Sequence, residues 1–285
     1  MNHFQEQLHL LVTQALKEDI GTGDHSTLCC IPATQQGKAI LKVKQNGILA
    51  GVAVAQQIFK WVEPTATFTP YILDGQSIQN GDIAFEVQAS VHTILQCERL
   101  VLNCMQRMSG IATLTKQYTQ LLQPYATQLL DTRKTTPNFR LLEKEAVRIG
   151  GGTNHRFGLY DMIMLKDNHI DYCGGITNAI NQAHQYVQKL PTPLQIEVET
   201  RTLADVQEAC TAGEGKIHRI MLDNFTPATI QEAMLIINHR FETEASGGIN
   251  LQTIQSYAAT GVTYVSVGGL IHQAQSLDLS LKAEI

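Results

Sequence analysis

Residues 194–200 read LQIEVET, and they are followed by a helical pattern at residues 203–212 and by residues 219–224, which read RIMLDN. The two apolar runs have the length and composition of short buried strands, and the segment between them has helical spacing. A strand, a helix and a second strand in this order predict parallel strands joined by a helical crossover. This segment therefore indicates an α/β fold.

The same alternation extends from about residue 126 to residue 268. Further strands are predicted at residues 128–132, 162–166, 241–247 and 264–268, and further helices at residues 138–149, 176–190, 227–240 and 251–260. Six strand–helix units of this kind suit a barrel better than an open sheet. We therefore predict an α/β barrel domain over residues 111–271.

Reactive side chains gather where these predicted strands end. The strands lead, in chain order, to Arg133 and Lys134, Lys166, Glu199, Asp223, Ser246 to Gly248, and Gly268. A single Asp or Lys in such a position is usually a turn residue or a helix cap, but six equivalent positions are hard to explain in that way. Because the carboxyl ends of barrel strands converge on one mouth, the pattern predicts an active site there.

Residues 1–110 follow a different pattern. An amphipathic helix comes first, and short β-rich runs such as residues 38–44 and 83–87 follow it, separated by turns that contain glycine. A helical stretch then covers residues 91–119. This organisation predicts a small α+β domain at residues 1–110, and the C-terminal tail, residues 272–285, is expected to pack back on it.

Whole-chain composition narrows the class of protein. The chain has 285 residues, a formal net charge of −5 and an apolar content of 44%, which is that of an ordinary globular protein. An acidic protein of this kind is not expected to bind nucleic acid, and no apolar run is long enough to span a membrane. Its six cysteines form no CxxC pair. We therefore expect reduced thiols without zinc or disulfides, and a cytoplasmic location.

A cationic segment contrasts with this acidic background. Between Arg133 and Lys166, seven Arg and Lys residues accompany three acidic residues, a local balance of +4. Several Arg and Lys in one place are typical of a site for a small polyanion. Lys144 and Arg148 are four residues apart in a helical pattern, so for these two we favour a solvated helix face.

Two glycine pairs form a candidate phosphate site. Gly247 and Gly248 follow Ser246 between a strand and a helix, and Gly268 and Gly269 repeat the pattern one unit later. Backbone N–H groups at such turns can bind a phosphate monoester, although tight turns alone also require glycine. Both pairs together favour a sugar-phosphate ligand at the last two strands of a barrel.

The carboxylates of the strand ends admit two interpretations. Glu197 and Glu199 share one face of their strand, which is costly inside a barrel unless a cation balances them. Glu199 and Asp223 are either ion-pair partners of the cationic segment or ligands for Mg²⁺ and ribose hydroxyls. In addition, His155 is interpreted as a donor to an anion and His169 as structural.

Six segments carry a resemblance to a known family: DTRKTTP at 131–137, GGTNHR at 151–156, LKDNHI at 165–170, IEVET at 196–200, MLDNF at 221–225 and EASGGI at 244–249. ERLVLN at 98–103, SGIA at 109–112 and EDIG at 18–21 also match. Together they resemble quinolinate phosphoribosyltransferase, the carboxylating nicotinate-nucleotide pyrophosphorylase, through essentially the whole chain. One local departure is Asn138, where the family often has glycine.

The resemblance implies a fold and a reaction. The fold would be an open, incomplete α/β barrel with a smaller N-terminal α+β sandwich domain. The enzyme would transfer the phosphoribosyl group of phosphoribosyl pyrophosphate to quinolinate, giving nicotinate mononucleotide, pyrophosphate and CO₂ for NAD biosynthesis, with Mg²⁺ as cofactor. It would be a homodimer, or a higher oligomer, in which the small domain of one subunit closes the barrel of the other.

The resemblance also implies residue roles. Arg133, His155 and Arg156 would hold the quinolinate carboxylates, and Arg99 would join them from the partner subunit. Lys134 and Lys166 would contact quinolinate or pyrophosphate, with Thr135 beside them. The remaining roles concern the sugar: Glu199 and Asp223 would hold the ribose and its Mg²⁺, and Ser246, Gly247, Gly248 and Gly268 would bind the 5-phosphate.

Three alternatives remain open at this stage. A related phosphoribosyltransferase with another substrate would share the phosphate and ribose sites. A Schiff-base lyase acting through Lys166 is a second alternative, but the nearby carboxylates would favour the charged form of this lysine. The third is a sugar-phosphate sensor without catalytic activity.

Overall fold

The computed structural model describes residues 3–284, which form two compact units. Unit 1 contains the described residues up to Lys116, residues 135–151 and the residues from Leu270 onward. Unit 2 contains residues 117–134 and 152–269. The domain boundary that we expected at residue 110 falls within helix α4, Val91–Leu122. The chain therefore passes from one unit to the other four times, after residues 116, 134, 151 and 269, whereas a single boundary was expected.

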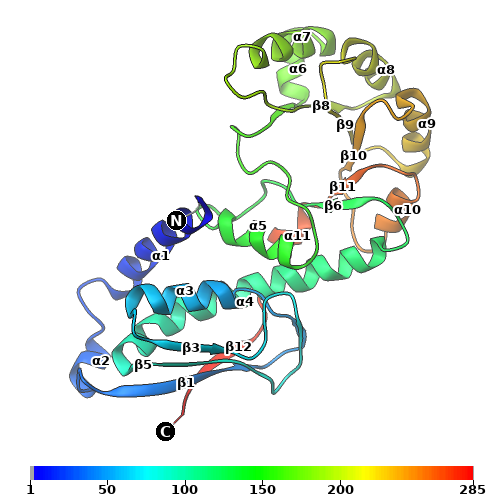
Figure 1. The fold of residues 1–285 in the computed structure, drawn as a ribbon. Helices are drawn as coiled ribbons and strands as arrows, with labels where there is room; N and C mark the ends of the chain where they lie inside the picture. The colour runs from blue at the N-terminus through cyan, green and yellow to red at the C-terminus, as the bar shows by residue number, and fades with distance from the viewer. Residues whose placement is uncertain (1–2, 285) are drawn as a thin grey trace. The chain divides into compact units, whose positions relative to one another are not determined.

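Unit 1 is built on an antiparallel sheet with the strand order β12-β1-β5-β3. The strands are β1 (Gln36–Val43), β3 (Thr67–Pro70), β5 (Ile83–Ser90) and β12 (Leu279–Glu284). Figure 1 shows α3 (Val52–Val62) and α4 on one face of this sheet. The ring of Phe68 lies 6.2 Å from that of Phe59 and 4.4 Å from that of Phe85, so an aromatic row joins α3 to the sheet.

Smaller elements complete unit 1. They are α1 (His3–Ile20), α2 (His25–Cys30), the short strands β2 (Gly47–Ile48) and β4 (Ser77–Ile78), α5 (Arg140–Ile149) and α11 (Gly269–His272), whose first residue belongs to unit 2. Residues 279–284 of the C-terminal tail form β12, which pairs with β1 from Lys38↔Glu284 to Val43↔Leu279. Lys38 adds ion pairs of 2.8 Å to Glu284 and 2.7 Å to Glu86. The end of the chain thus completes a sheet that begins near its start.

A buried ion pair holds three parts of unit 1 together. Arg107 of α4 donates to Glu143 Oε1 from Nε and Nη2, at 3.0 and 2.9 Å, and to the carbonyls of Ile271 and Ala274, at 2.7 and 2.8 Å. The backbone N–H of Thr136 donates to Glu143 Oε2 at 2.8 Å. The completely buried Glu143 side chain therefore joins α4, α5 and the loop before α5.

Helix α5 corrects one expectation. Lys144 is only 1% exposed, so the prediction of a solvated face was wrong for this residue, whereas Arg148 is exposed and pairs with Glu145 at 2.6 Å. The apolar face of α5 buries Glu143 and Lys144 together with Leu142, Ala146 and Val147. Apolar spacing alone does not reveal that two charged neighbours share this face.

Just before α5, Asn138 has φ +62°, in the left-handed region. Glycine adopts this conformation freely and asparagine tolerates it better than most residues. The departure from the family at this position is therefore compatible with the same turn.

Unit 2 contains the predicted parallel sheet. Its strands are β6 (Gln128–Leu130), β7 (Ile163–Leu165), β8 (Ile196–Thr200), β9 (Arg219–Asp223), β10 (Glu242–Ser246) and β11 (Tyr264–Ser266). Their order is β6-β11-β10-β9-β8-β7, and every pairing is parallel. Because β6 and β7 stand at opposite ends of this order, the barrel is open. The fold class expected from the sequence is confirmed.

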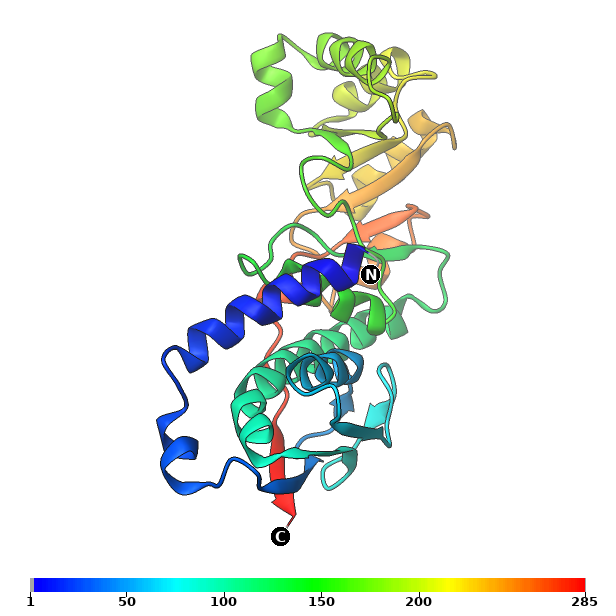
Figure 2. The same cartoon turned by 60° about the vertical axis from the view of Figure 1, so that its left-hand side comes forward.

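The helices of unit 2 cover the outer side of this sheet, as Figures 1 and 2 show. They are α6 (Asp167–Cys173), α7 (Ile176–Val187), α8 (Leu203–Ala212), α9 (Pro227–Ile237) and α10 (Ile254–Ala258). Four of the described helices, α2, α3, α6 and α11, were not predicted. Among residues 3–284, no helix combines the length and the apolar character needed to cross a membrane.

Candidate active site

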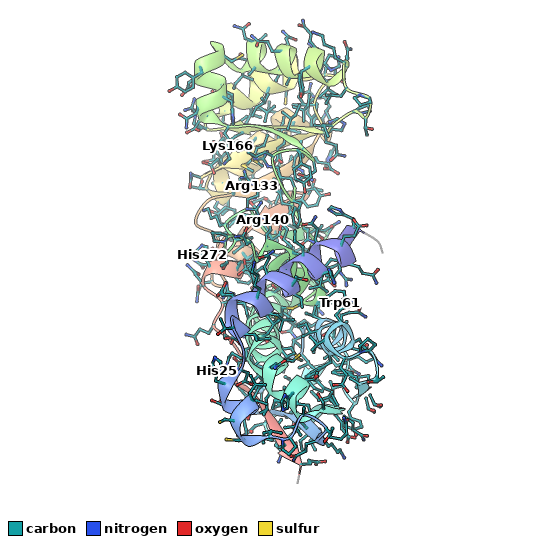
Figure 3. All side chains as sticks on the ribbon, turned by 90° about the vertical axis from the view of Figure 1, so that its left-hand side faces the viewer. His25, Trp61, Arg133, Arg140, Lys166 and His272 are labelled. Carbon is teal, nitrogen blue, oxygen red and sulfur yellow. The ribbon has the colours of Figure 1, made fainter. Side chains whose placement is uncertain are left out.

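The carboxyl ends of the strands in unit 2 carry the side chains predicted to be functional. Arg133 and Lys134 follow β6, and Lys166 follows β7; Figure 3 labels Arg133 and Lys166. Glu199 is the last residue but one of β8, and Asp223 ends β9. Because the strands are parallel, these groups share one edge of the sheet, as expected for a barrel mouth.

Two arginines form the cationic part of this edge. Burial lowers the pKa of Arg156, and the neighbouring positive charge of Arg133 lowers it further, so the two guanidinium groups act on each other. Arg156 Nη1 donates to the carbonyl of Met162 at 3.2 Å. Arg133 Nε is buried and has no hydrogen-bond partner among the described residues. Two facing cations with unused donors are suited to an anion with more than one carboxylate.

His155 precedes Arg156 in the chain and makes contacts through both ring nitrogens and its backbone N–H. Its Nε2 lies 3.0 Å from Glu197 Oε2 and 3.2 Å from Glu244 Oε2, and its backbone N–H donates to Asp131 at 2.8 Å. The backbone N–H of Arg156 donates to Nδ1 at 2.6 Å. The ring of His155 thus links two buried carboxylates to the residue that follows it.

Electrostatics favour a proton on the Nε2 of His155. Burial alone would lower the pKa of His155, but its hydrogen bonds to Glu197 and Glu244 outweigh this effect and raise it to about 9. This pKa favours a ring that is protonated at both nitrogens. A hydrogen bond from the N–H of Arg156 to Nδ1, in contrast, requires a neutral ring in which Nδ1 carries no proton. In both forms Nε2 carries a proton, and it lies at ion-pair distance from Glu197 and Glu244.

Arg219 completes a buried charge cluster with His155, Glu197 and Glu244. Its Nη1 lies 3.1 Å from Glu244 Oε2 and 3.7 Å from Glu197 Oε2, and its guanidinium stacks 4.1 Å above the ring of Tyr264. Burial and the negative charge of Glu244 raise the pKa of Glu197 to about 7. Glu197 was expected from the sequence to need a cation nearby, but Arg219 and Glu244 were not predicted as its partners.

The buried charge cluster also has the composition of a metal site. Within residues 3–284, His155, Glu197 and Glu244 form the one group that brings three potential ligand atoms within 4.8 Å of one another. Arg219 already supplies a cation to both carboxylates. We therefore interpret the cluster as an ion-pair network.

Glu199 and Asp223 are positioned differently from these buried groups. Glu199 Oε2 lies 3.4 Å from Lys166 Nζ, and its Oε1 accepts from the N–H of Asp167 at 3.4 Å. Asp223 Oδ2 accepts from the side chain of Asn224 at 2.7 Å. These long or peripheral bonds leave lone pairs for other partners. Oxygen ligands of this type suit Mg²⁺ or sugar hydroxyls.

Glycine is required where β10 ends. Gly247 has φ +97°, and a Cβ atom at this position would overlap the side chain of Asn224. Gly248 has φ +64° and is exposed. Ser246 pairs with Asp223 across β10 and β9, and Gly268 follows β11, the neighbour of β10 on its other side. The two glycine-containing turns therefore leave adjacent strands at the same edge.

Two predicted site residues belong to unit 1. Arg99 is exposed on α4, and the hydroxyl of Thr135 accepts from Arg140 Nε at 2.9 Å. The structure thus brings the other predicted residues together within unit 2, and Arg99 and Thr135 are part of the other unit.

Comparison with known proteins identifies the family. Residues 24–109 match the N-terminal domain of quinolinate phosphoribosyl transferase, and residues 111–282 match its C-terminal domain. The chain belongs to the quinolinate phosphoribosyl transferase family. Family membership assigns the reaction: a phosphoribosyl group passes from phosphoribosyl pyrophosphate to quinolinate, with decarboxylation, in NAD biosynthesis. The lyase and sensor alternatives are not favoured.

Individual members of the quinolinate phosphoribosyl transferase family agree over nearly the full chain. The quinolinate phosphoribosyltransferase [decarboxylating] 1b of Nicotiana tabacum is 43% identical over 96% of this chain and 81% of its own length. The probable nicotinate-nucleotide pyrophosphorylase of Bacillus subtilis is 41% identical over 99% and 94%. The crystal structure of NadC from Streptococcus pyogenes superposes with a TM-score of 0.90 at 42% identity, covering 97% of this chain and 95% of that one.

Proposed function

We propose that Arg133 and Arg156 bind the two carboxylates of quinolinate, assisted by Arg99 of the partner subunit. The observation that carries this assignment is the buried Nε of Arg133, which has no hydrogen-bond partner among residues 3–284, beside the mutually repelling guanidinium of Arg156. An anionic ligand would satisfy that donor and relieve the repulsion. His155 is assigned to the same subsite, where its bonds to Glu197, Glu244 and Arg156 make orientation its main contribution.

The ribose and its phosphate are proposed to occupy the neighbouring strand ends. Ser246, Gly247, Gly248 and Gly268 bind the 5-phosphate, since backbone N–H groups at these turns are accessible to oxygen atoms. Glu199 and Asp223 hold the ribose hydroxyls and Mg²⁺, directly or through substrate and water. When bound, the ion neutralises pyrophosphate charge, and the two carboxylates fit it because their oxygens keep free lone pairs.

These assignments describe how the residues promote the reaction. Departure of pyrophosphate leaves positive charge on the ribose ring, and Glu199 and Asp223 stabilise that charge. The pyridine nitrogen then attacks the anomeric carbon, so orientation replaces a covalent nucleophile. Lys134 and Lys166, both exposed, attract the leaving pyrophosphate or a quinolinate carboxylate. The positive charge of the pyridinium ring stabilises the electron pair that stays on the ring carbon when its carboxylate leaves as CO₂, and a proton from water then binds to that carbon.

A direct assay tests the proposed binding site. Purified protein is supplied with Mg²⁺, phosphoribosyl pyrophosphate and either quinolinate or nicotinate, and mononucleotide and CO₂ are measured. We expect quinolinate to be preferred on the order of a hundredfold, because nicotinate leaves one partly buried cation without a carboxylate. Comparable turnover of both acids would contradict the assignment of Arg133 and Arg156 to two carboxylates.

We also propose a cytoplasmic homodimer with shared active sites. All six cysteines of the described chain are free, which is compatible with a reducing compartment. Arg99→Ala and Lys166→Ala subunits, each inactive alone, should regain activity when mixed, because one hybrid site carries neither substitution. Mixed dimers that are verified by mass spectrometry and remain inactive would place Arg99 in its own subunit's site.

A further inference from the structure

The buried charge cluster adjoins Arg156 of the arginine pair in unit 2. Glu197 and Glu244 are both completely buried, and no sugar, phosphate or pyrophosphate role has been given to either. Burying two carboxylates this close together is costly unless cations balance them. Their partners are Arg219 and His155, and His155 is the one that leads toward the mouth.

A continuous chain of contacts connects the cluster to Arg156. Glu197 and Glu244 lie 3.0 and 3.2 Å from His155 Nε2, and the Nδ1 of the same ring lies 2.6 Å from the backbone nitrogen of Arg156. Asp131 holds the backbone N–H of His155 at 2.8 Å. The backbone leading into Arg156 is therefore anchored from three directions.

The side chain of Arg156 needs such an anchor. It lies close enough to Arg133 for the two positive charges to repel, so without support it would move away from its neighbour. Glu197 also contributes an attractive field at Arg156, in opposition to Arg133. The cluster thus acts on Arg156 through bonds and through charge.

We propose that Glu197 and Glu244 are positioning residues for quinolinate, which hold His155 and thereby keep Arg156 facing Arg133. This inference rests on the proposed function of the arginine pair. It assigns a role to two carboxylates that do not touch the substrate themselves. In the contacts described above, neither side chain pairs with Glu199 or Asp223, and Glu244 is also hydrogen-bonded to Ser266 at the end of β11. We therefore expect the main effect of both residues at the carboxylate subsite.

The test uses Glu197→Gln and Glu244→Gln in the full-length enzyme, with Glu242→Gln as a matched control. Glu242 lies on the same strand as Glu244 and pairs with the same Arg219 at 3.1 Å, but its side chain is 45% exposed and it does not contact His155. We expect the dissociation constant of quinolinate to rise about 10- to 100-fold in the first two variants and to stay near the wild-type value in the control. The KM for phosphoribosyl pyrophosphate should not change.

A double variant separates positioning from general stability. If Glu197 acts through His155, Glu197→Gln combined with His155→Gln should bind quinolinate no worse than His155→Gln alone, to within about twofold. The proposal would be overturned if the losses of quinolinate affinity in the two single variants added up in the double variant. It would also be overturned if both substrates bound equally more weakly, or if Glu242→Gln bound quinolinate as weakly as Glu197→Gln and Glu244→Gln. Thermal unfolding checks that each variant is folded. Should neither glutamate variant fold, a folded His155→Gln with wild-type affinity for quinolinate overturns it instead.

Discussion

Two buried carboxylates, Glu143 in unit 1 and Glu197 in unit 2, show how differently the same side chain is used. Both side chains have an exposed fraction of 0%. Glu143 accepts hydrogen bonds at both oxygens from Arg107 and Thr136, at 2.8 to 3.0 Å. Glu197 has ion-pair contacts only through Oε2, and its Oε1 has no hydrogen-bond partner among residues 3–284.

The contrast separates a structural ion pair from one that serves a site. A carboxylate whose lone pairs are used by rigid neighbours stabilises the fold, and little is left for other tasks. A carboxylate that is neutralised by neighbouring cations but keeps an oxygen without a hydrogen-bond partner responds to a charged ligand that binds nearby. We therefore expect substitutions of Glu143 to appear in unfolding experiments and substitutions in unit 2 to appear in binding and turnover.

The largest expected effect is the loss of stability on Glu143→Gln. It would leave the partly buried Arg107 against a neutral partner, which costs up to about 3 to 5 kcal/mol in the free energy of unfolding. Urea unfolding measures this value. Glu145→Gln is the control, because Glu145 pairs with the exposed Arg148 and should cost less than about 1 kcal/mol. Equal losses in both variants would remove the contrast between the two kinds of carboxylate.

The next largest effect is on turnover, in Asp223→Ala and Glu199→Ala. Both side chains meet positive charge on the ribose only as pyrophosphate leaves, so single-turnover rates should fall by about 3 to 4 kcal/mol, or a hundred- to a thousandfold, with little change in quinolinate affinity. Glu232→Gln, an exposed carboxylate of unit 2, should be neutral. An Asp223→Ala enzyme with normal chemistry but weak quinolinate binding would move Asp223 into a structural ion pair.

The smallest expected effect is the pH dependence of stability that His155 contributes. Its pKa rises from 6.5 to about 9 on folding, so the stabilisation is complete below pH 6.5 and is lost as the pH rises through 9. Urea unfolding of the wild type between pH 7 and 9.5 should show this decline. In His155→Gln the same decline should be weaker, and identical curves would exclude the cluster as its source.

Sequence predicted the strand ends well, because alternating strands and helices place polar residues at known positions. It missed the buried cluster for a definite reason. Arg219 faces Glu197 on one side and Glu242 on the other only because of the register of β8, β9 and β10. Charged residues of opposite sign in neighbouring predicted strands were the available signal, but register is a property of the folded sheet.

Two other differences have equally local causes. No helix was predicted directly after the strand at residues 162–166, but Asp167 starts α6, where the N–H of Lys166 donates to His169 Nδ1 at 3.0 Å. A helix of seven residues is too short for apolar spacing to reveal it. Lys144 was assigned to solvent because the local pattern cannot show which neighbours cover a helix.

The pairing of β12 with β1 has a consequence for how the chain folds during synthesis. Leu41 of β1 has Leu281 of β12 as its neighbour, so one edge of β1 stays without this partner until the ribosome has made residues 279–284. Unpaired strand edges are sites at which nascent chains associate with one another. That edge therefore needs protection from the synthesis of β1 until the synthesis of β12, and truncation before residue 279 should yield a chain that aggregates rather than one that merely lacks a tail.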